Sequence, residues 1–353
     1  MPKQLELFSA NHPKFPSTRY QGSKSKFSNW IWDCIKHIPF NTVLDAFGGT
    51  GSVSYRLKQE GKSVTYNDIL PCNHVIGKAL IENQNVTIDE SDLDYILTEH
   101  NEISYPKFIY STFKDIYYTE DENEWLDKTI TNIRTLINPY KQALAYFALF
   151  QACLIKRPYN LFHRKNLYTR LSNVKRSFGN KKTWDTSFAT HFTKFVKEGN
   201  HAIFNNNHNC ISLNYDVFKI DETYDLVYVD PPYFNKKGMG INYADFYHFL
   251  NGILYYDTWG SRIDYNSKNL KLLSQPNIWS NSKTITTAFK QVFSKFKESI
   301  LVISYRSDGT PTISEIADLL KDFYPHIDIH YSNEIKYALS STKCTEVLIV
   351  AQP

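Results

Sequence analysis

The sequence of 353 residues has only five cysteines, and no two of them are spaced as Cys-x-x-Cys. They are spread along the chain at positions 34, 72, 153, 210 and 344. Zinc clusters and disulfide frameworks need cysteines in recurring spacings, so this distribution argues against a metal centre and against a disulfide-stabilised fold. It favours a protein of the reducing cytoplasm.

A long apolar run is also missing. The longest uninterrupted one, residues 143–150, is far shorter than the roughly 20 apolar residues that a membrane-spanning helix needs. The N-terminal stretch MPKQLELFSANHPKF lacks the apolar core of a signal peptide. We therefore expect a soluble, cytoplasmic protein with no membrane association. The net charge of +4 is mild, and it allows a polyanionic partner without requiring one.

Acidic residues are missing from one stretch of the chain. Residues 156–182 contain nine lysines and arginines but no aspartate or glutamate. A solvated helix face normally mixes both signs, whereas basic side chains interleaved with asparagine and aromatics suit phosphates and bases. This favours a nucleic-acid partner over a merely solvated surface. The candidate contact residues are Arg157, Arg164, Lys165, Asn166, Arg170, Lys175 and Arg176.

One short motif carries the most chemical information. The apolar run 224–229 predicts a buried strand, and Asp230-Pro231-Pro232-Tyr233 ends it. A proline restricts the residue before it, so Asp230 is held extended at the carboxyl end of the strand, where ligands of open α/β sheets bind. A carboxylate, a fixed carbonyl and an aromatic ring are thus presented together, and this set suits a planar exocyclic amine. An ordinary proline turn with Asp230 as a local cap is the alternative.

A glycine-rich turn precedes this motif. Residues 42–45 predict a strand that runs into Gly48-Gly49-Thr50-Gly51, but Ser54 stands where a dinucleotide fingerprint would have its third glycine. The pattern is therefore weak for NAD and suits an adenosyl ligand. The next predicted strand, residues 63–66, leads to Asp68, which is placed to bind ribose hydroxyls or to cap a helix.

Two further segments flank this core. Gly22, Ser23 and Lys24 precede a helical pattern that begins at Phe27, and they suit a carboxylate at a helix start or form an ordinary basic loop. Residues 75–200 are mostly helical by pattern, and residues 260–285 are polar and irregular. Further strands are predicted at 210–216, 300–305 and 345–350.

Together these pieces resemble the Dam-like (D12 class) family of DNA adenine-N6 methyltransferases. The matching segments are RYQGSKSK at 19–26, DAFGGTGS at 45–52, NDI at 67–69, DPPY at 230–233, SYR at 304–306 and STKCTEVLIV at 341–350. The resemblance implies an α/β fold, with a doubly wound, Rossmann-like methyltransferase sheet and an inserted, mainly helical DNA-recognition domain. It places the catalytic domain at residues 1–90 and 205–353, and the recognition domain at 91–204.

The resemblance also implies S-adenosyl-L-methionine as cofactor. Tyr20, Gly22 and Lys24 would surround its methionine end, and Asp68 would bind its ribose. The complete set of implied cofactor contacts is Tyr20, Gly22, Lys24, Asp45, Phe47, Gly49, Gly51, Asp68 and Asp216. The implied catalytic residues are Asp230, Pro231, Pro232 and Tyr233, with no metal. Double-stranded DNA is the implied partner of a monomeric enzyme in a restriction-modification system, whose cognate endonuclease would act separately.

The chemistry of such a site follows from its acceptors. An adenine amino group is a poor nucleophile, because its lone pair is delocalised into the ring. Hydrogen bonds to the Asp230 carboxylate and the Pro231 carbonyl would localise that lone pair and permit direct attack on a sulfonium methyl. The target base would leave the duplex and stack on Tyr233.

Other reactions stay open at this point. Cytosine-C5 methylation needs a cysteine nucleophile, for which Pro71-Cys72 is a poor match. Cytosine-N4 methylation uses the same amine chemistry, usually with serine in place of Asp230. An RNA adenine methyltransferase, a catalytically silent DNA-binding protein and a NAD-dependent oxidoreductase are the remaining alternatives.

Overall fold

The structure is a computed structural model that describes residues 13–172, 174, 181–235, 240, 242–275, 277–333, 335–336 and 343–353. Two predicted nucleic-acid contacts, Lys175 and Arg176, lie outside the described residues.

In the described part of the chain, seven strands form one sheet in the order β3-β2-β1-β4-β6-β11-β8. Their bounds are β1 Thr42–Asp45, β2 Ser63–Asn67, β3 Ile211–Leu213, β4 Leu226–Val229, β6 Ile300–Arg306, β8 His326–Tyr331 and β11 Glu346–Gln352. β11 runs antiparallel to β6 and to β8, whereas the pairings from β3 through to β6 are parallel. The chain passes from β1 to β2, which pairs with one edge of β1, and β4 pairs with the other edge of β1. The carboxyl ends of β1 and β4 therefore form the switch point at which open α/β sheets bind ligands.

Alternate residues of the central strands feed two separate hydrophobic clusters. Val43 belongs to one cluster and Leu44 to the other, and Tyr228 and Val229 divide in the same way. Such a strand is buried on both faces. The flanking helices are α1 Ser28–Ile35, α2 Ser52–Gln59 and α3 Pro71–Gly77 on one face, with α13 Ile285–Lys295 and α14 Ile313–Leu320 on the other. The doubly wound α/β fold expected from the sequence is confirmed.

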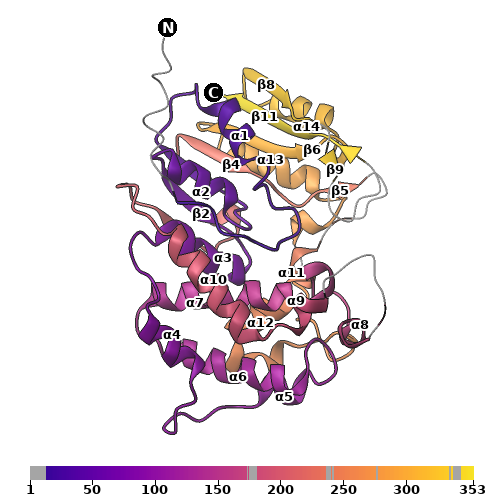
Figure 1. Ribbon diagram of the computed structural model, residues 1–353. Coiled ribbons are helices and arrows are strands. Elements are labelled where there is room, and N and C mark those ends of the chain that lie inside the picture. Colours follow the sequence, from indigo (N-terminus) through magenta and orange to yellow (C-terminus); the bar gives the residue numbers. More distant parts are fainter. Residues whose placement is uncertain are drawn as a thin grey trace.

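A helical layer lies beside the sheet (Figure 1). It contains α4 Glu90–Leu97, α5 Phe108–Thr112, α6 Glu120–Thr135, α7 Pro139–Ile155, α8 Leu167–Leu171, α9 Lys181–Asp185 and α10 Phe188–Ala202. Every residue of α7 from Ala143 to Ile155 is buried, because α7 packs against α10 as well as α3. A helix that is apolar on all sides needs such an environment.

A second segment completes this layer. Helix α12 (His248–Leu254) and the short turns η4 (Tyr256–Thr258) and η5 (Gly260–Arg262) lie beside α5. The ring of Trp259 packs against Phe113 at 4.9 Å and Phe249 at 5.1 Å. The helical layer is thus built from two stretches of sequence, of which the predicted recognition domain contains only the first. The domain bounds at 91–204 stay a prediction, since the cluster on this face of the sheet continues into the helices.

Short elements complete the description. These are α11 Tyr243–Phe246, the paired strands β5 Phe234–Asn235 and β7 Gly309–Thr310, the paired strands β9 Ile335–Lys336 and β10 Lys343–Cys344, and the helical turns η1 Lys78–Glu82, η2 Pro158–Asn160, η3 Val217–Lys219 and η6 Ile278–Ser280. Among the residues that the structure describes, no helix is both long enough and apolar enough to cross a membrane.

Candidate active site

A cavity of about 470 Å³ opens at the carboxyl ends of β1 and β4. Small-molecule sites in proteins typically span about 300–1,000 Å³. The cavity brings together most of the residues that the sequence predicted for cofactor and catalysis, namely Tyr20, Gly22, Lys24, Asp45, Phe47, Gly49, Asp68, Asp230, Pro231, Pro232 and Tyr233. Of the described residues predicted to contact the cofactor, Gly51 and Asp216 lie outside the cavity lining.

These two residues have local structural roles instead. Gly51 precedes α2 with a φ of 76°, a left-handed conformation that favours glycine. The carboxylate of Asp216 accepts a hydrogen bond from the Phe218 amide at 3.1 Å and so caps the turn η3. Both residues thus have local structural roles, and their predicted contacts with the cofactor stay predictions.

The glycine-rich turn is held by an aromatic residue of β2. A Cβ on Gly48 would lie 2.0 Å from the ring of Tyr66, so the ring packs directly on the backbone. The Tyr66 hydroxyl donates a 2.7 Å hydrogen bond to the carbonyl of Gly49. Gly49 itself has a φ of 52° and lines the cavity, and the atoms nearest to a Cβ there would be 3.9 Å away. Glycine at this position keeps the cavity open to a ligand.

Ser54 explains why the third glycine of a dinucleotide fingerprint is missing. Its hydroxyl donates a 2.5 Å hydrogen bond to the buried carboxylate of Asp45. Burial raises the pKa of Asp45 to about 7, and the Ser54 hydrogen bond opposes that rise. The serine thus supports an ionisable group of the cavity, where a glycine would leave it without this donor.

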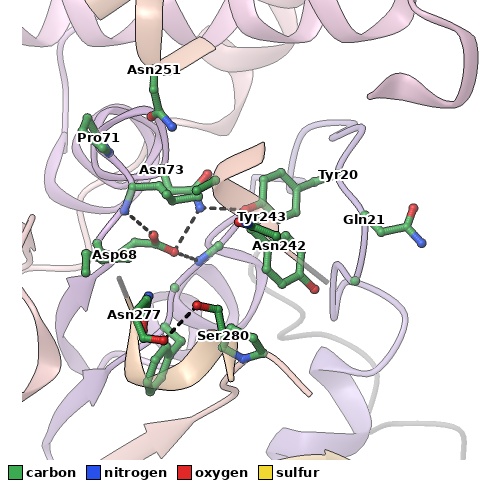
Figure 2. Close-up of a pocket in the computed structure, with 18 of the residues that line it drawn as sticks. Tyr20, Gln21, Asp68, Pro71, Asn73, Asn242, Tyr243, Asn251, Asn277 and Ser280 are labelled. Carbon is green, nitrogen blue, oxygen red and sulfur yellow. Dashed lines mark hydrogen bonds between the residues drawn. The ribbon is translucent and has the colours of Figure 1, made fainter. Parts of the chain in front are cut away.

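Asp68 is fixed by three donors at the edge of the cavity, as Figure 2 shows. Its oxygens accept hydrogen bonds from the amide of Gly49 at 2.9 Å, the amide of Leu70 at 2.8 Å and the side chain of Asn73 at 3.0 Å. Burial raises the pKa of Asp68, and the three hydrogen bonds act in the opposite direction. The carboxylate therefore holds Leu70, the residue before α3, and lines the cavity at the same time.

An aromatic stack forms another wall. The ring of Tyr20 is near-parallel to two neighbouring rings, with its centroid 4.1 Å from that of Tyr247 and 5.7 Å from that of Tyr243. The Tyr20 hydroxyl accepts a 2.9 Å hydrogen bond from Asn73 (Figure 2). Gly22 has a φ of 81°, and a Cβ there would lie 2.6 Å from the Tyr243 hydroxyl. Neither Tyr243, which lines the cavity, nor Tyr247, which packs on Tyr20, was predicted from the sequence, because no local pattern shows these tertiary contacts.

The Lys24 ammonium pairs with two carboxylates of the protein. Its ammonium donates to Asp230 at 2.8 Å and lies 3.1 Å from Glu346, which is fully buried in β11. The hydroxyl of Ser304 donates a 2.6 Å hydrogen bond to the same Glu346 oxygen. Burial raises the pKa of Asp230 to about 6, with Lys24 opposing and Glu346 reinforcing the rise. The sequence predicted a contact of Lys24 with the cofactor, and it indicated no role for Ser304 or Glu346.

Tyr233 is buried among charged groups. The Arg306 guanidinium lies 5.1 Å from its ring centroid, and the Lys24 ammonium 5.9 Å. Arg306 is held by two hydrogen bonds to Asp308, at 2.8 and 2.7 Å. Tyr305 meets the Tyr233 ring edge-on at 6.0 Å. The segment SYR therefore supports the aromatic residue of the tetrapeptide.

The predicted nucleic-acid contacts divide into buried and exposed groups. Arg157 is 1% exposed and donates to the carbonyls of Tyr117, Leu161 and Arg164 and to the side chain of Asn166. Arg170 is 4% exposed and pairs with Glu122 at 2.7 Å. The predicted contacts of Arg157, Asn166 and Arg170 with nucleic acid are therefore wrong, because their polar groups are directed into the protein.

The other two described residues of the predicted nucleic-acid contacts lie on the surface. Arg164 and Lys165 are exposed, in the loop before α8. Lys156, also in the basic run, is buried and pairs with Glu122 at 2.9 Å. The missing acidic partner of the run thus comes from α6.

The thiol considered for cytosine-C5 chemistry is not positioned for it. Cys72 is fully buried, and burial raises the pKa of its thiol. Its own amide is bonded to the side chain of Asn251 at 3.0 Å. A nucleophilic cysteine needs thiolate character and access to substrate, so this alternative fails.

The comparisons with known proteins agree with this geometry. The sequence model of the family described as D12 class N6 adenine-specific DNA methyltransferase matches residues 20–308. Type II methyltransferase M2.HphI of Haemophilus parahaemolyticus is 33% identical over 253 residues, which cover 69% of this chain and 73% of that protein. Type II methyltransferase M.NlaIII of Neisseria lactamica is 23% identical over 319 residues, covering 86% of this chain and 88% of that protein.

The chain therefore belongs to the D12 class of N6 adenine-specific DNA methyltransferases. It is an enzyme that methylates adenine in DNA, and S-adenosyl-L-methionine is its methyl donor.

The cavity has the features that this donor requires. Gly49 leaves one position of the lining open, and Gly22 lets the Tyr243 hydroxyl approach the backbone. The Asp68 carboxylate can accept hydrogen bonds from ribose hydroxyls, and the ring of Tyr20 offers an apolar wall. Asp230 adds a buried carboxylate beside these groups.

Proposed function

We propose that the enzyme methylates one adenine within a specific sequence of double-stranded DNA, after that base has been flipped out of the helix into the cavity. The observation that supports this most directly is that Asp230, Pro231, Pro232 and Tyr233 line the same cavity as Gly22, Gly49 and Asp68. Both reactants can then meet without a covalent enzyme intermediate. Holding two reactants in one oriented pocket is itself a large catalytic effect.

Each residue of the tetrapeptide has a part in the proposed mechanism. The bound donor supplies a methyl group on a positively charged sulfonium. The Asp230 carboxylate and the Pro231 carbonyl accept hydrogen bonds from the adenine N6 amine and localise its lone pair for attack. Asp230 also takes the proton that the amine releases. Tyr233 offers its ring to the flipped base, which offsets part of an unstacking cost on the order of a few kcal/mol.

The exposed basic residues suit the phosphate backbone. Arg164 and Lys165 lie in the same layer as α12 and η5, and Arg262 of η5 lines the cavity. We assign phosphate contacts to Arg164 and Lys165, and to Lys175 and Arg176 on sequence alone. Arg157, Asn166 and Arg170 support the fold of this region from inside.

The biological setting is also part of the proposal. Both relatives are named type II methyltransferases, so we assign this enzyme to a restriction-modification system with a separately acting endonuclease. The five free cysteines suit the cytoplasm. We also propose that the enzyme acts as a monomer.

The decisive experiment is transfer of labelled methyl from S-adenosyl-L-methionine to unmethylated duplex DNA, followed by nucleoside analysis. We expect N6-methyladenine at one recurrent sequence. N4-methylcytosine, or incorporation into RNA but not DNA, would contradict the proposal. So would the absence of incorporation by a protein that demonstrably binds the donor.

A further inference from the structure

Asp230 of the tetrapeptide forms a cluster with two other ionisable groups, and the three come from distant parts of the chain. Lys24 precedes α1, Asp230 follows β4 and Glu346 begins β11. The single ammonium of Lys24 lies 2.8 Å from Asp230 and 3.1 Å from Glu346. Lys24 and Asp230 line the cavity, whereas Glu346 lies behind them with 0% exposure. Glu346 can thus affect the reaction through Lys24 and Asp230 without lining the cavity itself.

The position of Glu346 is fixed on every side. Its backbone amide donates a 3.0 Å hydrogen bond to the Ser332 hydroxyl, and its backbone carbonyl accepts one of 2.9 Å from the Ser332 amide. Ser304 of the neighbouring strand β6 donates to its side chain at 2.6 Å. A carboxylate taken out of water is costly unless it is paired and hydrogen-bonded, and both conditions are met here. If this position served only to fill the core, an uncharged side chain would be sufficient there.

Resting on the proposed function of Asp230, we propose that Glu346 is a positioning residue for methyl transfer, which shares the Lys24 ammonium with Asp230 and thereby keeps the Asp230 carboxylate a strong hydrogen-bond acceptor. With one cation between two carboxylates, Lys24 neutralises Asp230 only in part. Without Glu346, Lys24 would pair with Asp230 alone and weaken it as an acceptor and as a base for the amine proton. The direction agrees with the causes of the raised pKa of Asp230, to which Glu346 adds and against which Lys24 acts.

Other ionisable groups also face Asp230 and must be considered in a titration. Tyr228 of β4, Tyr243 of α11 and Asp45 of β1 all interact with it electrostatically. Burial raises the pKa of each of these groups, and the two tyrosines stay neutral through the range in which Asp230 titrates. Asp45 is the one member of this set that titrates nearby, at about 7. A test therefore needs a readout specific to Asp230.

The first test is a carboxyl ¹³C NMR titration of the ligand-free protein, in which Asp230 is assigned by its loss in Asp230→Asn. The Asp230 midpoint in Glu346→Gln should lie below that of the wild type, by on the order of one pH unit for the loss of a neighbouring like charge. Glu298→Gln, at an exposed site, is the matched control and should leave the midpoint unchanged. An unmoved or raised midpoint in Glu346→Gln overturns the proposal.

The second test is kinetic. The acidic limb of kcat against pH should move to lower pH in Glu346→Gln, and kcat on its plateau should fall, while KM for DNA stays within about twofold of the wild type. A lower kcat with an unmoved limb would mean a merely structural role, and overturns the proposal. If Glu346→Gln does not fold, Glu346→Met is the second uncharged variant, since an apolar residue of similar volume is often tolerated in place of a buried ion-pair partner. An Asp230 midpoint at the wild-type value in Glu346→Met overturns the proposal.

These results separate the two proposals. A wild-type enzyme that forms no N6-methyladenine contradicts the proposed function, whatever the NMR titration gives. A wild-type enzyme that is active, with an Asp230 midpoint that ignores Glu346, contradicts this inference alone.

Discussion

Ser54 and Asp45 are joined by a 2.5 Å hydrogen bond across the turn that opens the methyltransferase fold. The carboxylate is buried, and this burial raises its pKa to about 7 from an ordinary value near 4. Asp45 is therefore a group whose ionisation the folded protein resists. The stability of the enzyme should depend on pH for this reason.

We expect Asp45→Asn to stabilise the ligand-free enzyme at pH 8 and to have little effect near pH 4. The pKa of Asp45 is higher in the folded than in the unfolded protein. Its contribution to the stability of the wild type is therefore fully present below the unfolded pKa and is lost as pH rises through the folded pKa of about 7. The amide can still accept from Ser54 but carries no charge. The upper bound of the gain is on the order of 4 kcal/mol. Urea unfolding at both pH values measures it, and equal gains at both would contradict the assignment.

Gly48→Ala should destabilise the enzyme. The new Cβ would lie 2.0 Å from the Tyr66 ring, which is fixed by its hydrogen bond to Gly49 and cannot yield without disturbing the turn. We expect a loss of at least about 1–3 kcal/mol in the free energy of unfolding. Gly260→Ala is the control, since its Cβ would meet other atoms no closer than 3.5 Å. Similar losses in both variants would count against the packing argument.

Asp230→Ala should abolish most of the methyl transfer and leave both ligands bound. Lys24 retains Glu346 as a partner in this variant, so the site keeps a paired cation. A fall in kcat of roughly 100- to 1,000-fold is expected for the loss of an acceptor that acts on the transition state. Single-turnover kinetics with separate measurement of donor and DNA binding tests this. Near-normal turnover would remove Asp230 from the mechanism.

Replacing Arg164 and Lys165 together by alanine should weaken DNA binding and make it less sensitive to salt. Each lost phosphate contact lowers the slope of log K against log salt by about 0.9, so the pair should lower it by up to about 2. Lys321→Ala, at an exposed lysine after α14, is the matched control. An unchanged slope in the double variant would place the DNA on another surface.

Arg170→Ala should act on stability instead. It removes one of the two cations that pair with Glu122 in the described part of the chain and leaves Lys156 as the other. Breaking a buried pair in this way typically costs about 3–5 kcal/mol. The exposed pair of Lys181 and Asp185 provides the comparison, since Lys181→Ala should cost less than about 1 kcal/mol. Thermal unfolding of the two variants distinguishes these roles.

The core of the fold was predictable because its strands carry strong local signals. β1, β4, β6 and β11 are apolar runs bounded by turn residues, and each was placed within a few residues of its observed bounds. β8 was missed, since it lies at the sheet edge with exposed residues such as Ile329 and Tyr331. An edge strand pairs on one side only, and its sequence need not look like a core strand.

The site shows where local reasoning ends. The tetrapeptide and the glycine turn were recognisable as motifs, but the buried pairing of Arg170 with Glu122 joins residues 48 positions apart. A run of cations without local acids therefore looked like a contact surface for nucleic acid, although Glu122 of α6 neutralises part of it. Glu346 was overlooked for the same reason, because its partner Lys24 lies near the other end of the sequence. Tertiary partners of buried charges leave no trace in a local pattern.

The central position of β11 has a consequence for how the enzyme is made. This strand lies between β6 and β8 and delivers Glu346 to Lys24, although it is among the last segments of this sequence to be synthesised. A nascent chain that has not yet released residues 346–352 from the ribosome has an open β6 edge and an incomplete catalytic cluster. We therefore expect full methylating activity only after translation has passed this strand.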